Sequence, residues 1–135
     1  MTGTDLEIIP PPHAQIAGDT AERLAVLRTN AKSDYELLAV WLKSHADGSE
    51  HTRVAYQRIG GRFLDALATD LRHANIDHVQ TALEILRTNP NGSTASPATV
   101  NANVAVVKSL LGFSHRVGFT SFNAGQRITL RKAPR

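Results

Sequence analysis

Apolar side chains recur at intervals of three and four residues in four separate segments between residues 34 and 118. This spacing follows the 3.6-residue period of an α-helix, so each segment is expected to bury one apolar face. No segment keeps the two-residue alternation of a half-buried strand long enough to build a sheet. The sequence therefore predicts an all-α bundle of four to five helices.

Capping residues place the starts of these helices. The first is expected over about residues 34–44, and Gly118 is expected to end the last. Ser, Asn and similar side chains accept hydrogen bonds from the free N–H groups of a first helical turn. Proline is favoured at the first helical position, as in Ser96-Pro97. The expected N-caps of the second, third and fourth helices are Ser49, Asn75 and Ser96.

Three local features refine this prediction. The pair Gly60-Gly61 weakens the second helix by about 1 kcal/mol per glycine relative to alanine, and it is typical of a close helix crossing or a kink. Phe119 and Phe122 are expected to pack back on the bundle as an aromatic pair. Residues 128–130 are expected to form a short extended piece.

The chain divides into three expected regions. Residues 1–19 contain three consecutive prolines and no helical period, so they are expected to be a disordered tail. Residues 20–124 are expected to form one helical domain, beginning with a short helix capped by Thr20. Residues 125–135 form a basic segment.

Charge is distributed unevenly along the sequence. The net charge of +3 combines −4 over residues 1–50 with +7 over residues 51–135, and no carboxylate side chain follows Glu84. Such an asymmetry favours a polyanionic partner for the C-terminal part, although a solvated basic surface would give the same count.

Several classes of protein are excluded or disfavoured by composition. The absence of cysteine excludes disulfides and cysteine-ligated zinc. No apolar run is long enough to span a membrane and no secretory signal is recognisable, so a cytoplasmic location is expected. The histidines are scattered without carboxylates at ligand spacing, and no nucleotide-binding or hydrolase motif occurs. We expect no metal, no cofactor and no active site.

Two expected helix starts carry short polar side chains. The first reads Ser49-Glu50-His51-Thr52-Arg53, and the second begins Ser96-Pro97-Ala98-Thr99 and continues to Asn101 and Asn103. Free N–H groups and the helix dipole favour a phosphate at such a start. Short polar side chains one turn further on can reach base edges in a major groove. Capping alone would also explain both serines.

The same residues carry a family resemblance, which covers roughly residues 34–135. The pattern Ser49-x-x-Thr52-x-x-x-Tyr56, with Phe63 after six intervening residues, resembles a helix signature of the core-binding domain of tyrosine recombinases, the phage-integrase, Xer and Cre group. Residues 75–83 resemble the third-helix region of that domain. Residues 96–113, with Ser96, Thr99, Val100 and Asn101 at the start, resemble its fourth helix. Gly118, Asn123 and the basic end resemble the turn and linker toward the catalytic domain.

This resemblance implies a SAM-like helical domain that clamps one face of double-stranded DNA at a recombination site. The family assembles as tetramers across two sites, so other recombinase protomers are implied partners. A bacterial, phage or plasmid origin is implied as well. The residues implied to contact DNA are Thr52, Arg53, Ser96, Thr99, Asn101, Asn103, Lys108, Arg127, Arg131 and Lys132.

The chemistry of the family needs a tyrosine nucleophile and a His-x-x-Arg set. No His-x-x-Arg occurs here, and the only tyrosines, Tyr35 and Tyr56, lie in expected helices of the DNA-binding part. We therefore expect that this chain neither cuts nor joins DNA, and that a longer recombinase would supply the reaction. Two alternatives remain: a helical protein-interaction module using Leu24, Leu27 or Trp41, and an enzyme with an unrecognised site.

Overall fold

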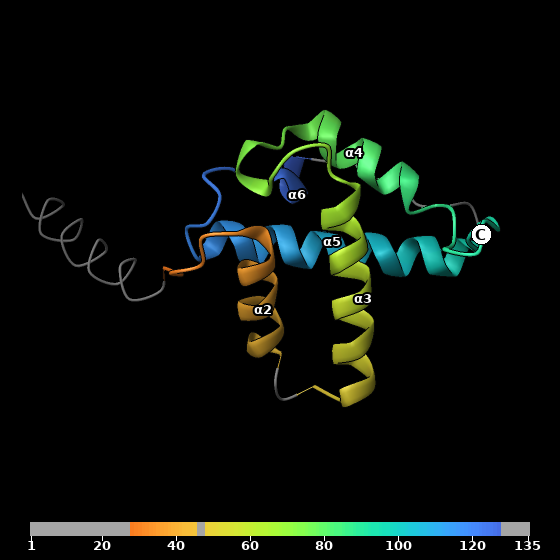
Figure 1. Cartoon of the computed structure of the whole chain (residues 1–135), viewed down its shortest axis with the longest axis horizontal. Coiled ribbons are helices and arrows are strands. Elements are labelled where there is room, and N and C mark those ends of the chain that lie inside the picture. Colours follow the sequence, from red (N-terminus) through yellow and green to blue (C-terminus); the bar gives the residue numbers. More distant parts are fainter. Residues whose placement is uncertain (1–27, 46–47, 128–135) are drawn as a thin grey trace, which may run out of the picture.

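The computed structural model describes residues 28–45 and 48–127, and the described part is all-α (Figure 1). No β-strand occurs within these ranges, as predicted. A 3-10 turn, η1, spans Leu71–His73. The α-helices are α2 (Asp34–Ser44), α3 (Glu50–Ala66), α4 (Ile76–Ile85), α5 (Pro97–Arg116) and α6 (Ala124–Arg127). The predicted tail, the short helix after Thr20 and the extended piece at 128–130 lie outside the described residues.

The predicted helix starts are confirmed. Ser49, Asn75 and Ser96 each have extended backbone and accept a hydrogen bond from the N–H three residues later. Asn75 forms a capping box, because His78 in turn accepts from the Asn75 N–H at 3.0 Å. Gly118 follows α5 with φ of 75°, a backbone conformation that glycine adopts without strain.

Helix α5 is the centre of the bundle. It packs against α2 and α3 and also against α6, while α4 packs on α3 (Figure 1). The core contains Trp41 and Leu37 from α2, Phe63 from α3, and Val107 and Leu110 from α5, all with no exposed surface. A smaller apolar cluster joins Ala95, Val100 and Val104 to Leu83, and it holds the start of α5 against α4.

Gly60 lies where α3 passes closest to its neighbours. A Cβ at this position would be 2.8 Å from Leu38 Cδ1 and 3.3 Å from the Trp41 ring, whereas one at Gly61 would meet nothing within 4 Å. The predicted close crossing is therefore confirmed at Gly60, and α3 continues without interruption to Ala66.

Hydrogen bonds tie α2 to the rest of the bundle. Both oxygens of the Asp34 carboxylate accept from the Leu71 N–H, at 3.1 and 3.0 Å, and burial raises the pKa of this carboxyl. The Tyr35 hydroxyl donates to Asp65 of α3, and this bond raises the pKa of Tyr35. Trp41 stacks on Tyr56 with ring centroids 5.2 Å apart.

Two predictions need correction, and one helix was not predicted. Phe119 is buried but Phe122 is 42% exposed, so the two do not form the predicted pair in the core. Trp41 is completely buried and cannot anchor a partner, which removes one residue of the interaction-module alternative. Helix α6 was not predicted; it packs on α5 through Gly125, where an added Cβ would be 3.5 Å from Leu111.

Candidate nucleic-acid interface

The starts of α3 and α5 have the same cap. Ser49 Oγ accepts from the Thr52 N–H at 3.1 Å and donates to Thr52 Oγ1 at 2.9 Å. Ser96 Oγ accepts from the Thr99 N–H at 3.2 Å and donates to Thr99 Oγ1 at 3.0 Å. Because each threonine hydroxyl accepts in this pair, its own hydrogen stays available to donate to a ligand.

The two starts offer different numbers of free backbone donors. In α3 the N–H groups of Glu50 and His51 have no partner among the described residues. In α5 the first residue is Pro97, which has no N–H, so Ala98 alone supplies a free donor in that turn. Thr99 is exposed and Thr52 is half-buried, so α5 presents its hydroxyl more openly.

The two starts are separate positions on the molecule. Helices α3 and α5 cross near Gly60 and Leu110, and each helix starts well away from this crossing (Figure 1). At 1.5 Å per residue, the start of α3 is about 15 Å from the crossing and the start of α5 is about 20 Å away. Each start would therefore contact a ligand at a different point.

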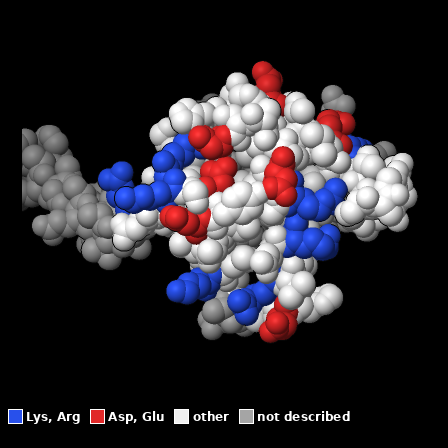
Figure 2. Space-filling model, in the orientation of Figure 1, with Lys and Arg blue, Asp and Glu red and all other residues white. Residues whose placement is uncertain are grey.

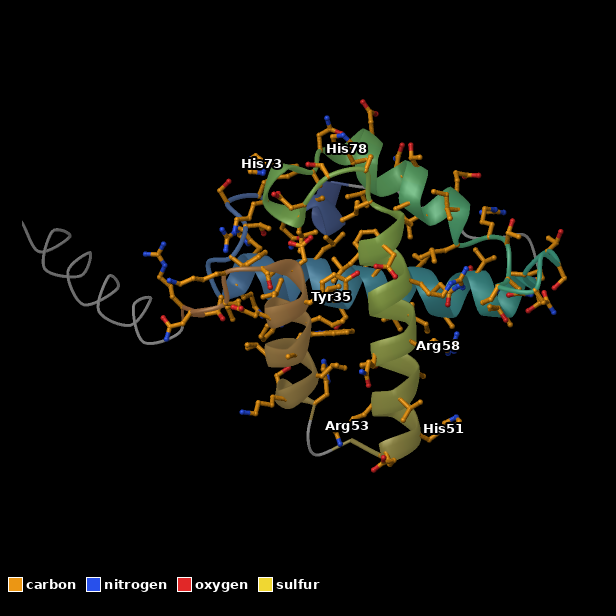
Figure 3. All side chains as sticks on the ribbon, in the orientation of Figure 1. Tyr35, His51, Arg53, Arg58, His73 and His78 are labelled. Carbon is orange, nitrogen blue, oxygen red and sulfur yellow. The ribbon has the colours of Figure 1, made fainter. Side chains whose placement is uncertain are left out.

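Helix α3 carries a row of cationic and titratable side chains. His51, Arg58 and Arg62 are spaced by seven and four residues, so they share one side of α3. Figure 3 shows His51 and Arg58 on the side toward which the first half of α5 extends. We call these three residues the α3 row. Arg62 also donates to the Thr88 carbonyl at 2.9 Å, which fixes the loop before α5.

Among the residues that the structure describes, no Lys or Arg side chain lies within 4.0 Å of a carboxylate. The ion pair within this part of the chain joins His73 and Asp70. The cations of the α3 row are therefore available to an anion. They do not form one broad basic face, because basic and acidic side chains are interspersed on the surface seen in Figure 2.

The predicted site residues divide by exposure. Arg53 and Lys108 are exposed, and Arg53 projects to the opposite side of α3 from Arg58, beside Leu42 of α2 (Figure 3). Asn101 is half-buried, and its Oδ1 has no hydrogen-bond partner among the described residues. Asn103 is only 5% exposed, so its side chain offers little surface to a ligand, and its predicted contact with DNA stays a prediction.

The remaining predicted residues lie at the end of the chain. Arg127 is the last residue of α6, and Arg131 and Lys132 lie outside the described residues. The sequence analysis did not single out His51 and Arg58, which the structure places on one side of α3. Their spacing of seven along a helix starting at Ser49 was the signal that could have found them.

The described ranges contain no cluster of three or more His, Asp or Glu side chains placed to hold a metal ion. No described helix is long and apolar enough to cross a membrane. A scan against protein-family models, a search of curated proteins and a search of solved structures found no match for this chain.

Proposed function

We propose that this chain binds double-stranded DNA through the starts of α3 and α5 and the α3 row. The observation that carries this proposal is the pair of matching Ser-x-x-Thr caps at the starts of α3 and α5. It is supported by the cations of the α3 row, which have no carboxylate partner among the described residues. Phosphates bind at helix starts through N–H groups, hydroxyls and the helix dipole, and arginines add charge-assisted contacts.

The proposal extends to the family that the sequence resembles. In this view the chain is a SAM-like core-binding domain of a tyrosine recombinase, and a longer protein supplies the catalytic tyrosine and arginines. The described all-α fold is compatible with such a domain. In this proposal Thr99 and Asn101 would contact bases, and residues 97–107 carry no charged side chain that would favour phosphate alone.

A sharp test adds a negative charge at the cap residue while keeping its capping hydrogen bond. Ser49→Asp and Ser96→Asp each retain an oxygen that accepts from the third N–H, but each adds a carboxylate at a proposed phosphate contact. We expect each variant to bind a fluorescein-labelled duplex at least tenfold more weakly than the unmodified chain, in an anisotropy titration at low salt.

Asn75→Asp is the matched control. It makes an equal change of charge at the cap of α4, which the proposal does not place on DNA. We expect this variant to lose far less affinity than the other two. Equal losses at all three caps would show a general charge effect and would contradict the assignment to α3 and α5.

A further inference from the structure

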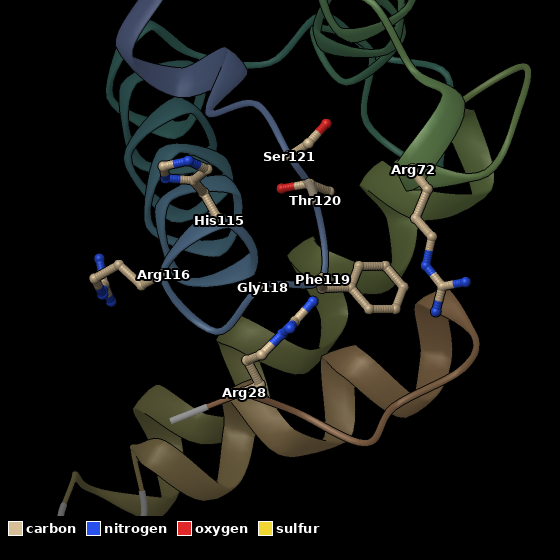
Figure 4. Close-up of a pocket in the computed structure, with 8 residues that line it drawn as sticks. All are labelled: Arg28, Arg72, His115, Arg116, Gly118, Phe119, Thr120 and Ser121. Carbon is tan, nitrogen blue, oxygen red and sulfur yellow. The ribbon is translucent and has the colours of Figure 1, made fainter. Parts of the chain in front are cut away.

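A second cationic site lies at the C-terminal end of α5, opposite the helix start that is proposed to contact DNA. Two adjoining hollows of about 460 and 370 Å³ share Arg28, Arg72, Gly118 and Phe119. No carboxylate of the described residues lines either hollow. The larger hollow is also lined by His115, Arg116, Thr120 and Ser121 (Figure 4).

Three segments distant in the sequence hold the two shared arginines in place. The Arg72 guanidinium lies over the Phe119 ring, 4.3 Å from its centroid, and donates to the Ala31 carbonyl at 3.2 Å. The Thr29 N–H donates to the Val117 carbonyl at 2.9 Å, which joins the segment of Arg28 to the end of α5. The two arginines therefore lie on neighbouring sides of the turn after α5 (Figure 4).

Gly118 allows Arg28 to approach this turn. A Cβ at Gly118 would be 3.0 Å from Arg28 Nε, so the arginine packs directly on the glycine backbone. The positive φ at this position also favours glycine. The turn is thus shaped so that a guanidinium group lies against main chain rather than against a side chain.

The charges in this site are not balanced by the described residues. Asp34 and Asp70 lie near enough to interact with Arg72 through space, but neither comes within 4.0 Å of it, and Asp70 is paired with His73. Arg28 and Arg72 line both hollows, and each brings a cationic guanidinium group to them. An oxyanion in the hollows that they share would be attracted by both side chains, and the guanidinium fork fits phosphate oxygens.

One of the residues that line this site also has a polar atom without a partner. Thr120 Oγ1 is buried and makes no hydrogen bond with the described residues, which is unusual for a buried hydroxyl. Ser121 is exposed beside it and can donate through its own hydroxyl.

We propose that Arg28 and Arg72, with the turn 118–121, bind a phosphate group. The phosphate can belong to a small molecule or to the backbone of a nucleic acid, and the chemistry of recognition is the same. This inference is independent of the proposed DNA contact, because the starts of α3 and α5 supply none of these residues.

The test is an NMR titration of the full chain, labelled with 15N, with inorganic phosphate at constant ionic strength. We expect the amide signals of residues 118–121 to shift and to saturate. Arg28→Gln should weaken this binding at least tenfold. Lys43→Gln, which removes one exposed charge from α2, should leave it unchanged.

Ser121→Asp provides a second variant at an exposed position. It places a carboxylate in the hollow, so we expect it to abolish the phosphate-dependent shifts while the rest of the amide spectrum stays as in the unmodified chain. The proposal is overturned if phosphate moves signals all over the surface, or if both variants bind phosphate as the unmodified chain does.

A duplex titration then distinguishes the sources of the phosphate. If a short duplex shifts residues 118–121 and phosphate competes with it, the site holds a backbone phosphate. If the duplex shifts only the starts of α3 and α5 while phosphate still saturates residues 118–121, the site takes a small phosphorylated molecule. Both results support the phosphate site, and only the duplex signals at α3 and α5 bear on the proposed function.

Discussion

Gly60 and Gly61 are adjacent in α3 but differ in what surrounds them. A methyl group at Gly60 would press on Leu38 and Trp41, both of which are buried, and one at Gly61 would point into open space. We expect Gly60→Ala to lower the free energy of unfolding by about 1–3 kcal/mol, because overpacking outweighs the gain in helix propensity.

Gly61→Ala is the control for this prediction. It should raise the free energy of unfolding by up to about 1 kcal/mol through helix propensity alone. Urea unfolding of both variants gives the comparison. If the two substitutions had the same effect on stability, the conclusion that α3 crosses its neighbours closely at Gly60 would be wrong.

The carboxylate of Asp70 is predicted to make stability depend on pH. Asp70 Oδ1 lies 2.6 Å from His73 Nδ1, and this hydrogen bond holds the pKa of Asp70 below its ordinary value of 3.8. Because the folded-state pKa is below the unfolded one, Asp70 stabilises the fold above pH 3.8 and loses this contribution as the pH falls through the folded-state pKa.

Asp70→Asn keeps a capping oxygen for η1 and removes the charge. We expect the unmodified chain to be more stable than Asp70→Asn near neutral pH, with the difference shrinking once the pH falls below 3.8. Unfolding curves at a series of pH values measure this difference. A difference that stays constant with pH would assign the effect to something other than the carboxylate charge.

Among the elements, α5 depends on a single side chain at its start. Ser96 is its cap, and its side chain accepts from the Thr99 N–H. Pro97 has no N–H, so the first turn has fewer backbone donors that need a partner. We expect Ser96→Ala to lower the free energy of unfolding by about 1 kcal/mol. Ser96→Asp should keep most of the stability, since aspartate accepts the same hydrogen bond and suits the helix dipole.

Thermal and urea unfolding of both Ser96 variants test this prediction. The same measurement shows whether Ser96→Asp is folded. Only then can a loss of DNA binding by this variant be attributed to the added charge. A Ser96→Ala variant as stable as the unmodified chain would show that the cap does not hold the start of α5.

Helix boundaries were the part of the fold that the sequence predicted best. Caps at Ser49, Asn75 and Ser96 act on their own first turns, so local sequence is enough to find them. The burial of Trp41 and of Asn103 was not predicted, because it depends on which neighbouring helix covers each side chain. Helix α6 has only four residues and no apolar period to reveal it.

The two candidate sites differ in how they are built from the sequence. The starts of α3 and α5 could be proposed from short motifs, since each is built from consecutive residues. The cluster around Arg28 and Arg72 could not, because three segments meet there only after the chain has folded. Residue spacing carries no information about such a meeting.

The basic residues within 127–135 are predicted to strengthen DNA binding without selecting a sequence. Replacing Arg131 and Lys132 together with glutamine should weaken binding to all duplexes by a similar factor. The slope of log affinity against log salt should also become shallower by about 0.9 for each phosphate that the variant no longer neutralises.

Lys32→Gln combined with Lys43→Gln removes the same charge from residues that the proposal does not place on DNA. This double variant should change the slope much less. Duplexes of several sequences, titrated in parallel, show whether the weakening is uniform. A weakening confined to one sequence would instead give Arg131 or Lys132 a role in reading bases.

The other DNA-binding predictions all depend on whether the unmodified chain binds double-stranded DNA. The unmodified chain is titrated into a labelled duplex by fluorescence anisotropy at several salt concentrations. We predict binding at low salt that weakens linearly on a log–log plot, with a slope of about −0.9 for each phosphate that the chain neutralises. Absence of binding at high micromolar protein and low salt, or an affinity that salt does not change, would contradict the proposed function.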